Sequence, residues 1–281
     1  MIVVTGATGN VGQPLVQILA AAGEQVTAVS RRVSDSAGSE GVRHRQADLT
    51  DPESLRPIFE GADALFLHDG GASAHLLSPR DILDVAKASG VGRLVLLSSL
   101  GVATRPQSAS HGGMMRFIED AVRQTDMNWT ILRPGGFSSN AYAWAESIRA
   151  QRRVAAPFGD VGLPTIDPAD IAEVAAAALC EGGHRGQVYE LTGPALSTPR
   201  QRAEAIGDAI GEPIRFIDQT RDEARTQMLR FMPEAVIDTT LDVFGEPTPA
   251  EQRISPYVER ILGRPPRTFA DWAQAHVAAF R

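Results

Sequence analysis

Short apolar runs alternate with longer amphipathic segments through the first half of the chain. The short runs are aliphatic and β-branched, as in Ile2-Val3-Val4-Thr5, and this composition fits strands. The longer segments gather apolar residues on one helical face, as at positions 11, 15, 18 and 19. The pattern predicts helices at 10–22, 76–88 and 114–124, and strands at 2–5, 25–30, 42–46, 64–67, 93–98 and 129–133.

The order of these elements indicates the class of fold. Strands that alternate with helices imply parallel βαβ units, so we expect an α/β fold with a doubly wound parallel sheet. We expect residues 1–134 to form the sheet domain, with 168–192 packing back onto it, and residues 135–281 to form mainly a smaller, mostly helical lobe. In this second part helices are predicted near 139–150, 168–181, 198–210, 221–230, 233–244, 250–262 and 267–280, with short extended segments near 163–166, 187–192 and 213–217.

Composition narrows the classes of partner. The 281 residues have 43% hydrophobic content, which is enough to bury a full α/β core and a small second lobe. The net charge of −7 argues against a nucleic-acid surface, because neutralising phosphates requires clustered Lys and Arg. We therefore expect no nucleic acid among its partners.

The single cysteine and the N-terminal segment bear on the compartment. Cys180 ends the apolar run 171–180, and we expect it to be a buried packing residue rather than a reactive thiol. The chain opens without a basic and then apolar leader. No apolar stretch approaches the ~18 residues that span a bilayer. These features predict a soluble, cytoplasmic protein with no membrane partner.

Glycines recur at every third position after the first strand, in Thr5-Gly6-Ala7-Thr8-Gly9-Asn10-Val11-Gly12. Gly6 permits a tight turn, Gly9 lets a pyrophosphate approach backbone N–H groups, and Gly12 lets the next helix pack against the strand. The N-terminus of that helix offers unpaired N–H donors to phosphates. Because the motif joins a strand to an amphipathic helix, it predicts a Rossmann-type dinucleotide site, with contacts from Gly6, Thr8, Gly9, Asn10, Val11 and Gly12.

The end of the second strand discriminates between the two nicotinamide dinucleotides. NAD-binding units place a carboxylate there to bind the ribose 2′-hydroxyl, whereas this chain has Arg31 and Arg32. Guanidinium groups suit a 2′-phosphate. We therefore predict NADP(H) as the cofactor, while the nearby Asp35 leaves NAD(H) open. Asp48, followed by Leu49, is expected to lie near the adenine or to cap the next helix.

These motifs, taken together, resemble the NmrA-like branch of the atypical short-chain dehydrogenase/reductases. The similarity covers roughly residues 1–215 and includes the glycine loop, Ser98-Ser99, residues 129–137 with Asn140, 170–174 and 189–194. The resemblance implies an NAD(P)-binding fold whose C-terminal lobe caps a substrate pocket. Some members reduce quinones, azo compounds or small carbonyls, and others bind the cofactor as sensors without catalysis.

The wider superfamily uses Ser, Tyr and Lys, with the Lys four residues after the Tyr. Extended members carry a Glu four residues after the Lys, and counting back from Glu119 puts Met115 at the Lys position and His111 at the Tyr position. No Tyr-x-x-x-Lys occurs in the chain. The usual proton relay is therefore absent. Ser98 matches the position of the serine, and His111 is the best candidate for a proton donor, although it fits a plain helix start equally well.

The resemblance also implies where the substrate lies. It places Pro134, Gly135 and Phe137 along the nicotinamide, and Phe137, Asn140, Tyr142 and Trp144 around a substrate pocket. His68 and Asp69 follow the fourth strand and are expected to form a loop beside the cofactor. No spacing of His and Cys resembles a structural zinc site, so we expect no metal.

Three functions remain to be weighed. The first is an NAD(P)H-dependent oxidoreductase that transfers hydride to a small quinone, enone, azo or carbonyl substrate without the Tyr/Lys relay. The alternative is a non-catalytic NADP(H)-binding regulator of the NmrA type, acting through a protein partner. An epimerase or dehydratase is disfavoured because that chemistry depends on the Tyr base. A homodimer remains open for either function.

Overall fold

The computed structural model describes residues 1–32, 40–68, 76–108 and 111–281. Seven parallel strands form one sheet in the order β3-β2-β1-β4-β5-β6-β8. The α/β class and the doubly wound parallel sheet are therefore confirmed. The strands are β1 (Ile2–Thr5), β2 (Val26–Ser30), β3 (Val42–Gln46), β4 (Ala64–Leu67), β5 (Arg93–Leu97), β6 (Asn128–Pro134) and β8 (Gln187–Leu191).

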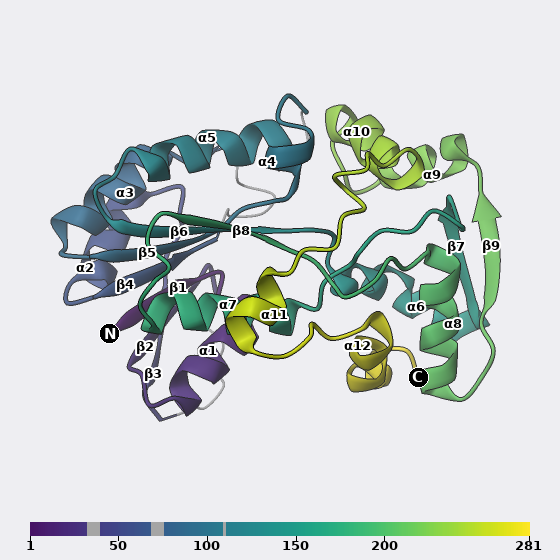
Figure 1. Cartoon of the computed structure of the whole chain (residues 1–281), viewed down its shortest axis with the longest axis horizontal. Helices are drawn as coiled ribbons and strands as arrows, with labels where there is room; N and C mark the ends of the chain where they lie inside the picture. The colour runs from purple at the N-terminus through teal and green to yellow at the C-terminus, as the bar shows by residue number, and fades with distance from the viewer. Residues whose placement is uncertain (33–39, 69–75, 109–110) are drawn as a thin grey trace.

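Helices cover both faces of this sheet, as Figure 1 shows. One hydrophobic core joins the sheet to α1 (Gly12–Ala21), α7 (Pro168–Cys180) and α11 (Tyr257–Leu262). A second core lies on the opposite face, because strands buried on both sides need cover on both sides. It packs against η1 (Pro52–Leu55), α2 (Arg56–Phe59), α3 (Pro79–Ala88), α4 (Gly101–Thr104) and α5 (His111–Arg123).

The strand order reverses between β1 and β4, and this is where an open α/β sheet forms its ligand crevice. Thr5 ties the two strand ends together at this point. Its hydroxyl donates to the Phe66 carbonyl oxygen at 3.0 Å and accepts from the His68 N–H at 2.8 Å. The glycine loop that follows Thr5 is thereby fixed at the carboxyl edge of the sheet.

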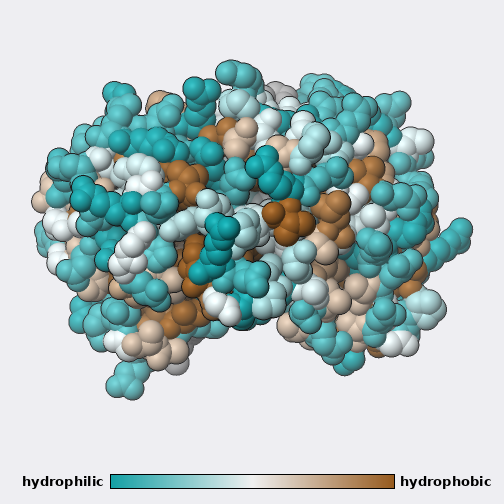
Figure 2. Space-filling view, viewed as in Figure 1, coloured by the Kyte–Doolittle hydropathy of each residue, from teal (hydrophilic) through white to brown (hydrophobic). Residues whose placement is uncertain are grey.

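A C-terminal lobe stands beside the carboxyl edge of the sheet (Figure 1). Its two strands pair in parallel, and its own hydrophobic core is centred on Trp272. Figure 2 shows a mostly hydrophilic surface whose outline is hollowed between the sheet domain and this lobe. The lobe consists of η3 (Ser138–Trp144), α6 (Ala145–Gln151), β7 (Arg153–Pro157), α8 (Pro199–Ile210), β9 (Arg215–Gln219), α9 (Arg221–Met228), α10 (Glu234–Gly245), α12 (Phe269–Ala275) and η4 (Val277–Ala279).

Some expectations from the sequence were wrong in detail. The helix predicted over 250–262 is helical only in α11, and the one over 139–150 begins with the 3-10 helix η3. β7 is a strand that the sequence pattern did not indicate. Cys180 is exposed at the end of α7, and the expectation that it is buried was wrong. Partial desolvation of the thiol raises its pKa. Within the described residues no helix is long and apolar enough to cross a bilayer.

Candidate functional site

The glycine loop follows β1, and two of its glycines pack closely against neighbouring atoms. Gly6 has a φ of +63°, a left-handed conformation that costs glycine nothing. A Cβ on Gly6 would lie 2.9 Å from Cγ of His68, and a Cβ on Gly12 would overlap the carbonyl oxygen of Gly6. The first and third glycines of the motif are therefore required by packing.

The N-terminus of α1 is free to receive an anion. Val11 occupies the N-cap position and makes no side-chain cap, and the first turn contains no acidic residue. Thr8, Gly9 and Asn10 are exposed in front of it. Unpaired N–H groups and the helix dipole together make such a terminus a phosphate site.

Two arginines follow β2 at the same edge. Arg31 and Arg32 are exposed, and neither forms an ion pair with any residue that the structure describes. The Ala47 N–H donates to the Ser30 carbonyl oxygen at 3.2 Å, so the ends of β2 and β3 lie together. Arg31 and Arg32 therefore follow the second strand at the carboxyl edge of the sheet, and their contact with the cofactor stays a prediction.

Asp48 follows β3 at this edge and is exposed. The Thr50 N–H donates to its Oδ1 at 3.0 Å. This hydrogen bond holds the pKa of the Asp48 carboxyl below its usual value, and the charge of Arg31 lowers it further. Leu49 points the other way, into the core under α2 and α3. Asp48 is therefore an ionised acceptor at neutral pH that also fixes its own turn.

The end of β6 leads from the sheet into the lobe. The Leu100 N–H donates to the Pro134 carbonyl oxygen at 2.9 Å, and Gly135 donates to Leu191 at 2.9 Å. Phe137 is half-buried and pairs through its backbone with Ile166. These bonds hold the segment 134–137 at the carboxyl edge of β5, β6 and β8.

The predicted relay helix, α5, begins at His111, whose side chain lies outside the described part of the structure. Gly112 follows, and a Cβ there would overlap the carbonyl oxygen of Arg105. Met115, at the position of the family's Lys, is 1% exposed and packs in the core between α5 and the sheet. Met115 therefore cannot hold a ribose or acidify a neighbouring hydroxyl.

Ser98 directly follows β5 and belongs to a buried charged network. Its hydroxyl donates to Oε1 of Glu119 at 2.5 Å, so its hydrogen is engaged with a carboxylate. Arg133 holds the same carboxylate through both Nε (2.8 Å) and Nη2 (2.6 Å), and Arg123 adds a bond at 3.3 Å. This arrangement gives Ser98 a structural partner, and its catalytic role stays a prediction.

The electrostatics of Glu119 follow from this network. Its burial alone would raise the pKa of the carboxyl, but Arg133, Ser98 and Arg123 together hold the pKa below its usual value. Glu119 is 1% exposed. The sequence analysis did not predict this network. A charged residue on the apolar helix face that includes Met115 and Ile118 was the signal, because a buried carboxylate needs a buried cation as its partner.

The predicted pocket residues lie at or in η3 and differ in their surroundings. Asn140 is exposed, whereas Tyr142 packs against Trp272, with ring centroids 5.2 Å apart, inside the core of the lobe. Trp144 packs against the same core. Burial raises the pKa of Tyr142, so its phenol is neutral at physiological pH. That Phe137, Asn140, Tyr142 and Trp144 line a substrate pocket stays a prediction.

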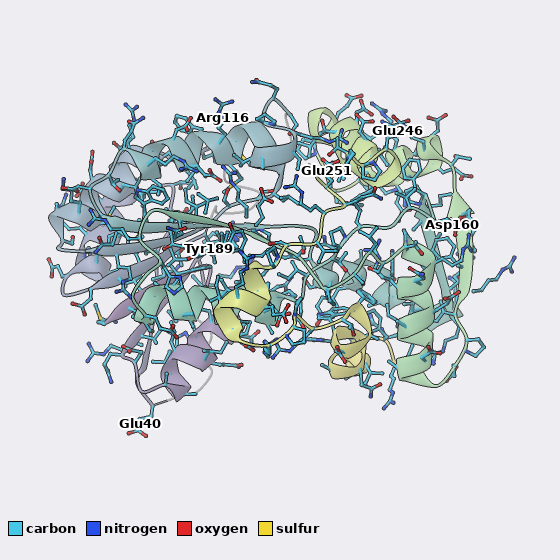
Figure 3. All side chains as sticks on the ribbon, in the orientation of Figure 1. Glu40, Arg116, Asp160, Tyr189, Glu246 and Glu251 are labelled. Carbon is cyan, nitrogen blue, oxygen red and sulfur yellow. The ribbon has the colours of Figure 1, made fainter. Side chains whose placement is uncertain are left out.

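Arg105 joins the sheet domain to the lobe, and sequence reasoning missed it. Its Nε and Nη2 bind the two oxygens of Glu251 at 2.7 and 3.1 Å. Figure 3 shows Glu251 between α4 and α10. Burial alone would raise the pKa of Glu251, but Arg105 and the N–H of Thr248 hold it below its usual value. This bidentate ion pair links the segment after α4 to the segment after α10, beside the start of α5.

His68 and Asp69 were predicted to form a loop after β4. The ring of His68 packs against the glycine loop. Asp69 lies outside the described residues. No cluster of three or more potential metal ligands occurs within 1–32, 40–68, 76–108 and 111–281.

Comparison with known proteins bears on this site. The model of the family described as NAD(P)H-binding matches residues 6–181. The (4-alkanoyl-5-oxo-2,5-dihydrofuran-3-yl)methyl phosphate reductase of Streptomyces griseus is 35% identical, over 100% of this chain and 99% of that protein. The NAD(P)H azoreductase of Xenophilus azovorans is 31% identical, over 100% of this chain and 99% of its own length.

Solved structures share the fold along the whole chain. The NADPH complex of the quinone oxidoreductase QOR2 from Escherichia coli has a TM-score of 0.82 and 24% identity, covering 99% of this chain and 100% of that one. The negative transcriptional regulator NmrA has a TM-score of 0.73 and 20% identity, covering 97% and 94%. The chain therefore belongs to the NAD(P)H-binding family, NAD(P)H is its cofactor, and it shares the fold of the NmrA regulator.

Proposed function

We propose that this protein is an NADPH-dependent reductase that transfers hydride to a small conjugated acceptor, such as a quinone, an azo compound or an enone. The observation that carries the proposal is the contrast between the two halves of the site. The close-packed glycine loop, the terminus of α1 without a side-chain cap, and Arg31 and Arg32, which have no ion-pair partner among the described residues, all support a dinucleotide site. The relay position on α5 holds the buried Met115.

Bound NADPH supplies the hydride, and the residues of this chain supply binding and orientation. The N–H groups at the start of α1 hold the pyrophosphate. Arg31 and Arg32 hold the 2′-phosphate, which favours NADPH over NADH. The segment 134–137 supports the nicotinamide, with Phe137 beside it. The C-terminal lobe caps the substrate, with Asn140 the exposed polar candidate in its first turn.

The acceptor class follows from the missing relay. A simple ketone needs a proton on oxygen as hydride arrives, and the Tyr/Lys pair normally supplies it. A quinone delocalises the incoming electron pair and takes up its protons afterwards, so water or one imidazole suffices. His111, at the start of α5, is the proposed proton donor. The relatives named for reduction of azo compounds and of a furanone phosphate fit this class of acceptor.

A direct assay tests this proposal. The purified protein is mixed with NADPH and a panel of quinones, azo dyes and enones, and absorbance is followed at the reduced-nicotinamide band. We expect saturable consumption with at least one quinone, well above the uncatalysed rate. A His111→Ala variant should slow turnover and change its pH profile, since imidazole titrates near neutral pH. An unchanged rate and profile would remove His111 from the mechanism.

A second candidate is a non-catalytic NADP(H) sensor, and the buried Met115 is the observation that favours it. This function predicts tight, saturable binding of the cofactor with no consumption by any acceptor. It also predicts that the cofactor changes the affinity of the protein for a protein partner. Binding without turnover across the whole panel would therefore replace the reductase by the sensor.

A further inference from the structure

A pocket lies in the C-terminal lobe, between α8, α12 and the segment 194–197. Its volume is about 200 Å³. Figure 1 shows α8 and α12 side by side, and they pack against each other. Apolar side chains, among them Leu196, Ala205 and Phe269, form most of the lining, together with the hydroxyls of Thr165 and Ser197.

Arg202 of α8 lines this pocket, and no counter-charge pairs with it among the described residues. Its one hydrogen bond runs from Nε to the carbonyl oxygen of Thr198, at 3.4 Å, and no carboxylate among the described residues lies within ion-pair distance. Arg200, two residues earlier on the same helix, is bound by both Asp160 and Asp218 at 3.0 Å. The guanidinium of Arg202 instead stacks over the Trp144 ring, 5.7 Å from its centroid.

This charge is partly removed from water. Arg202 is half-buried, and desolvation lowers the pKa of its guanidinium to about 10. The side chain therefore stays cationic at neutral pH. A desolvated cation without a counter-charge is unfavourable, and an anion brought to it recovers part of that cost. Its planar fork also suits two oxygens of one oxyanion.

The pocket is separated from the predicted cofactor cleft by a short strand-like segment, 163–166. This segment pairs with Phe137 on one side and with Ser197 on the other. The Thr165 methyl lies 4.0 Å from the place of a Cβ on Gly136. A ligand in the pocket would thus touch the segment that supports 134–137, without entering the glycine loop.

We propose that this pocket binds a small organic anion, with a carboxylate or phosphate head on Arg202 and an aromatic or aliphatic body against Leu196, Ala205 and Phe269. The two sources of such an anion are a free effector and the charged arm of a substrate held in the neighbouring cleft. Both use the same oxyanion contact with Arg202. This site goes beyond the proposed reductase activity, and its occupation is measured without turnover.

Benzoate and phenyl phosphate are suitable probes, and benzamide is the neutral counterpart of benzoate. Binding to the whole protein is measured by calorimetry and by quenching of tryptophan fluorescence, because Trp144 lies beside the anchor. We expect saturable binding of both anions and at least tenfold weaker binding of benzamide. Arg202→Gln should weaken the binding of both anions at least tenfold. Arg200→Gln is the matched control and should leave their affinity within about twofold, since Arg200 lies outside the lining.

A second variant and two competition experiments distinguish the remaining explanations. Ala205→Leu keeps the charge of Arg202 but fills the pocket, so it should weaken the binding of benzoate. This variant keeps the proposal testable even if the Arg202→Gln protein does not fold. Saturating NADPH should leave benzoate binding intact. Competition with the electron acceptor would identify the anion as a substrate arm, and non-competitive behaviour would identify an effector. The proposal is overturned if Ala205→Leu or a folded Arg202→Gln protein binds benzoate like the wild type, or if NADPH displaces it.

Discussion

The side-chain amide of Asn10 donates a hydrogen bond to the hydroxyl of Ser139 at 3.0 Å, across 129 positions of sequence. Asn10 lies in the glycine loop at the start of α1, and Ser139 lies in η3, the first turn of the C-terminal lobe. Ser139 is buried, whereas Asn10 is exposed. The bond therefore links the glycine loop to the element that enters the C-terminal lobe.

This link predicts coupled effects on cofactor binding. Asn10→Ala and Ser139→Ala should each weaken NADPH binding about fivefold, because a net hydrogen bond is worth about 1 kcal/mol. The double variant should be no weaker than either single variant, since both remove the same interaction. Titration of the four proteins with NADPH measures the coupling, and strictly additive effects would show that the two side chains act independently.

The third glycine of the loop gives a steric prediction. Gly12→Ala should abolish measurable NADPH binding, or weaken it more than tenfold, because the new Cβ would overlap the Gly6 carbonyl oxygen and push α1 away. Gly182→Ala is the control, since a Cβ there meets nothing within 4 Å. Isothermal titration compares both variants with the wild type. Normal affinity in Gly12→Ala would disprove the close approach of helix and loop.

The arginines after β2 determine the choice of cofactor in this account. Charge-assisted hydrogen bonds contribute about 1.5–3 kcal/mol each. Replacing Arg31 and Arg32 together by Gln should therefore raise the Kd for NADPH at least tenfold, and the Kd for NADH less than about twofold. Arg43→Gln, an exposed residue at the other end of β3, should change neither. Equal losses for both cofactors would assign the arginines a structural role.

The buried Glu119 gives a prediction for stability. Its folded pKa lies below the ordinary value of 4.5, so its stabilising effect is complete above that pH and is lost as the pH falls through the folded pKa. Glu119→Gln should cost about 3–5 kcal/mol at pH 7, because Arg133 would lose its buried counter-charge. At pH 3 the difference between the two proteins should shrink.

Urea unfolding at the two pH values measures this difference. Asp120→Asn is the matched control on the next residue, where the carboxylate is 58% exposed and 3.9 Å from Arg116. An exposed pair of this kind should contribute less than about 1 kcal/mol. A similar loss in both variants would contradict the role given to the network.

Local pattern was sufficient to predict the sheet and the close packing of the glycine loop. β1, β4 and β5 are short, mostly apolar runs, and β3 and β4 begin and end at the predicted residues 42–46 and 64–67. The glycine loop is equally local, because turn, close approach and helix start follow within eight residues. Such signals need no knowledge of distant partners.

Features made by distant segments could not be predicted in this way. β7 pairs with β9, about 60 positions later, and its Arg-Val-Ala-Ala-Pro run has little strand character alone. The Arg105–Glu251 pair joins residues separated by 146 positions. Arg202 is distinguished from Arg200 only by the absence of a carboxylate partner in the described structure. Each of these depends on which segments the fold brings together.

In the proposed function, the chain holds NADPH in the glycine loop and passes hydride to a conjugated acceptor. The most direct measurement is NADPH consumption with a naphthoquinone, by the wild type and by Gly12→Ala, at equal protein concentration. The wild type should consume NADPH saturably and in preference to NADH, and Gly12→Ala should show only the uncatalysed rate. Saturable NADPH binding by the wild type without consumption of any quinone, azo dye or enone would contradict it.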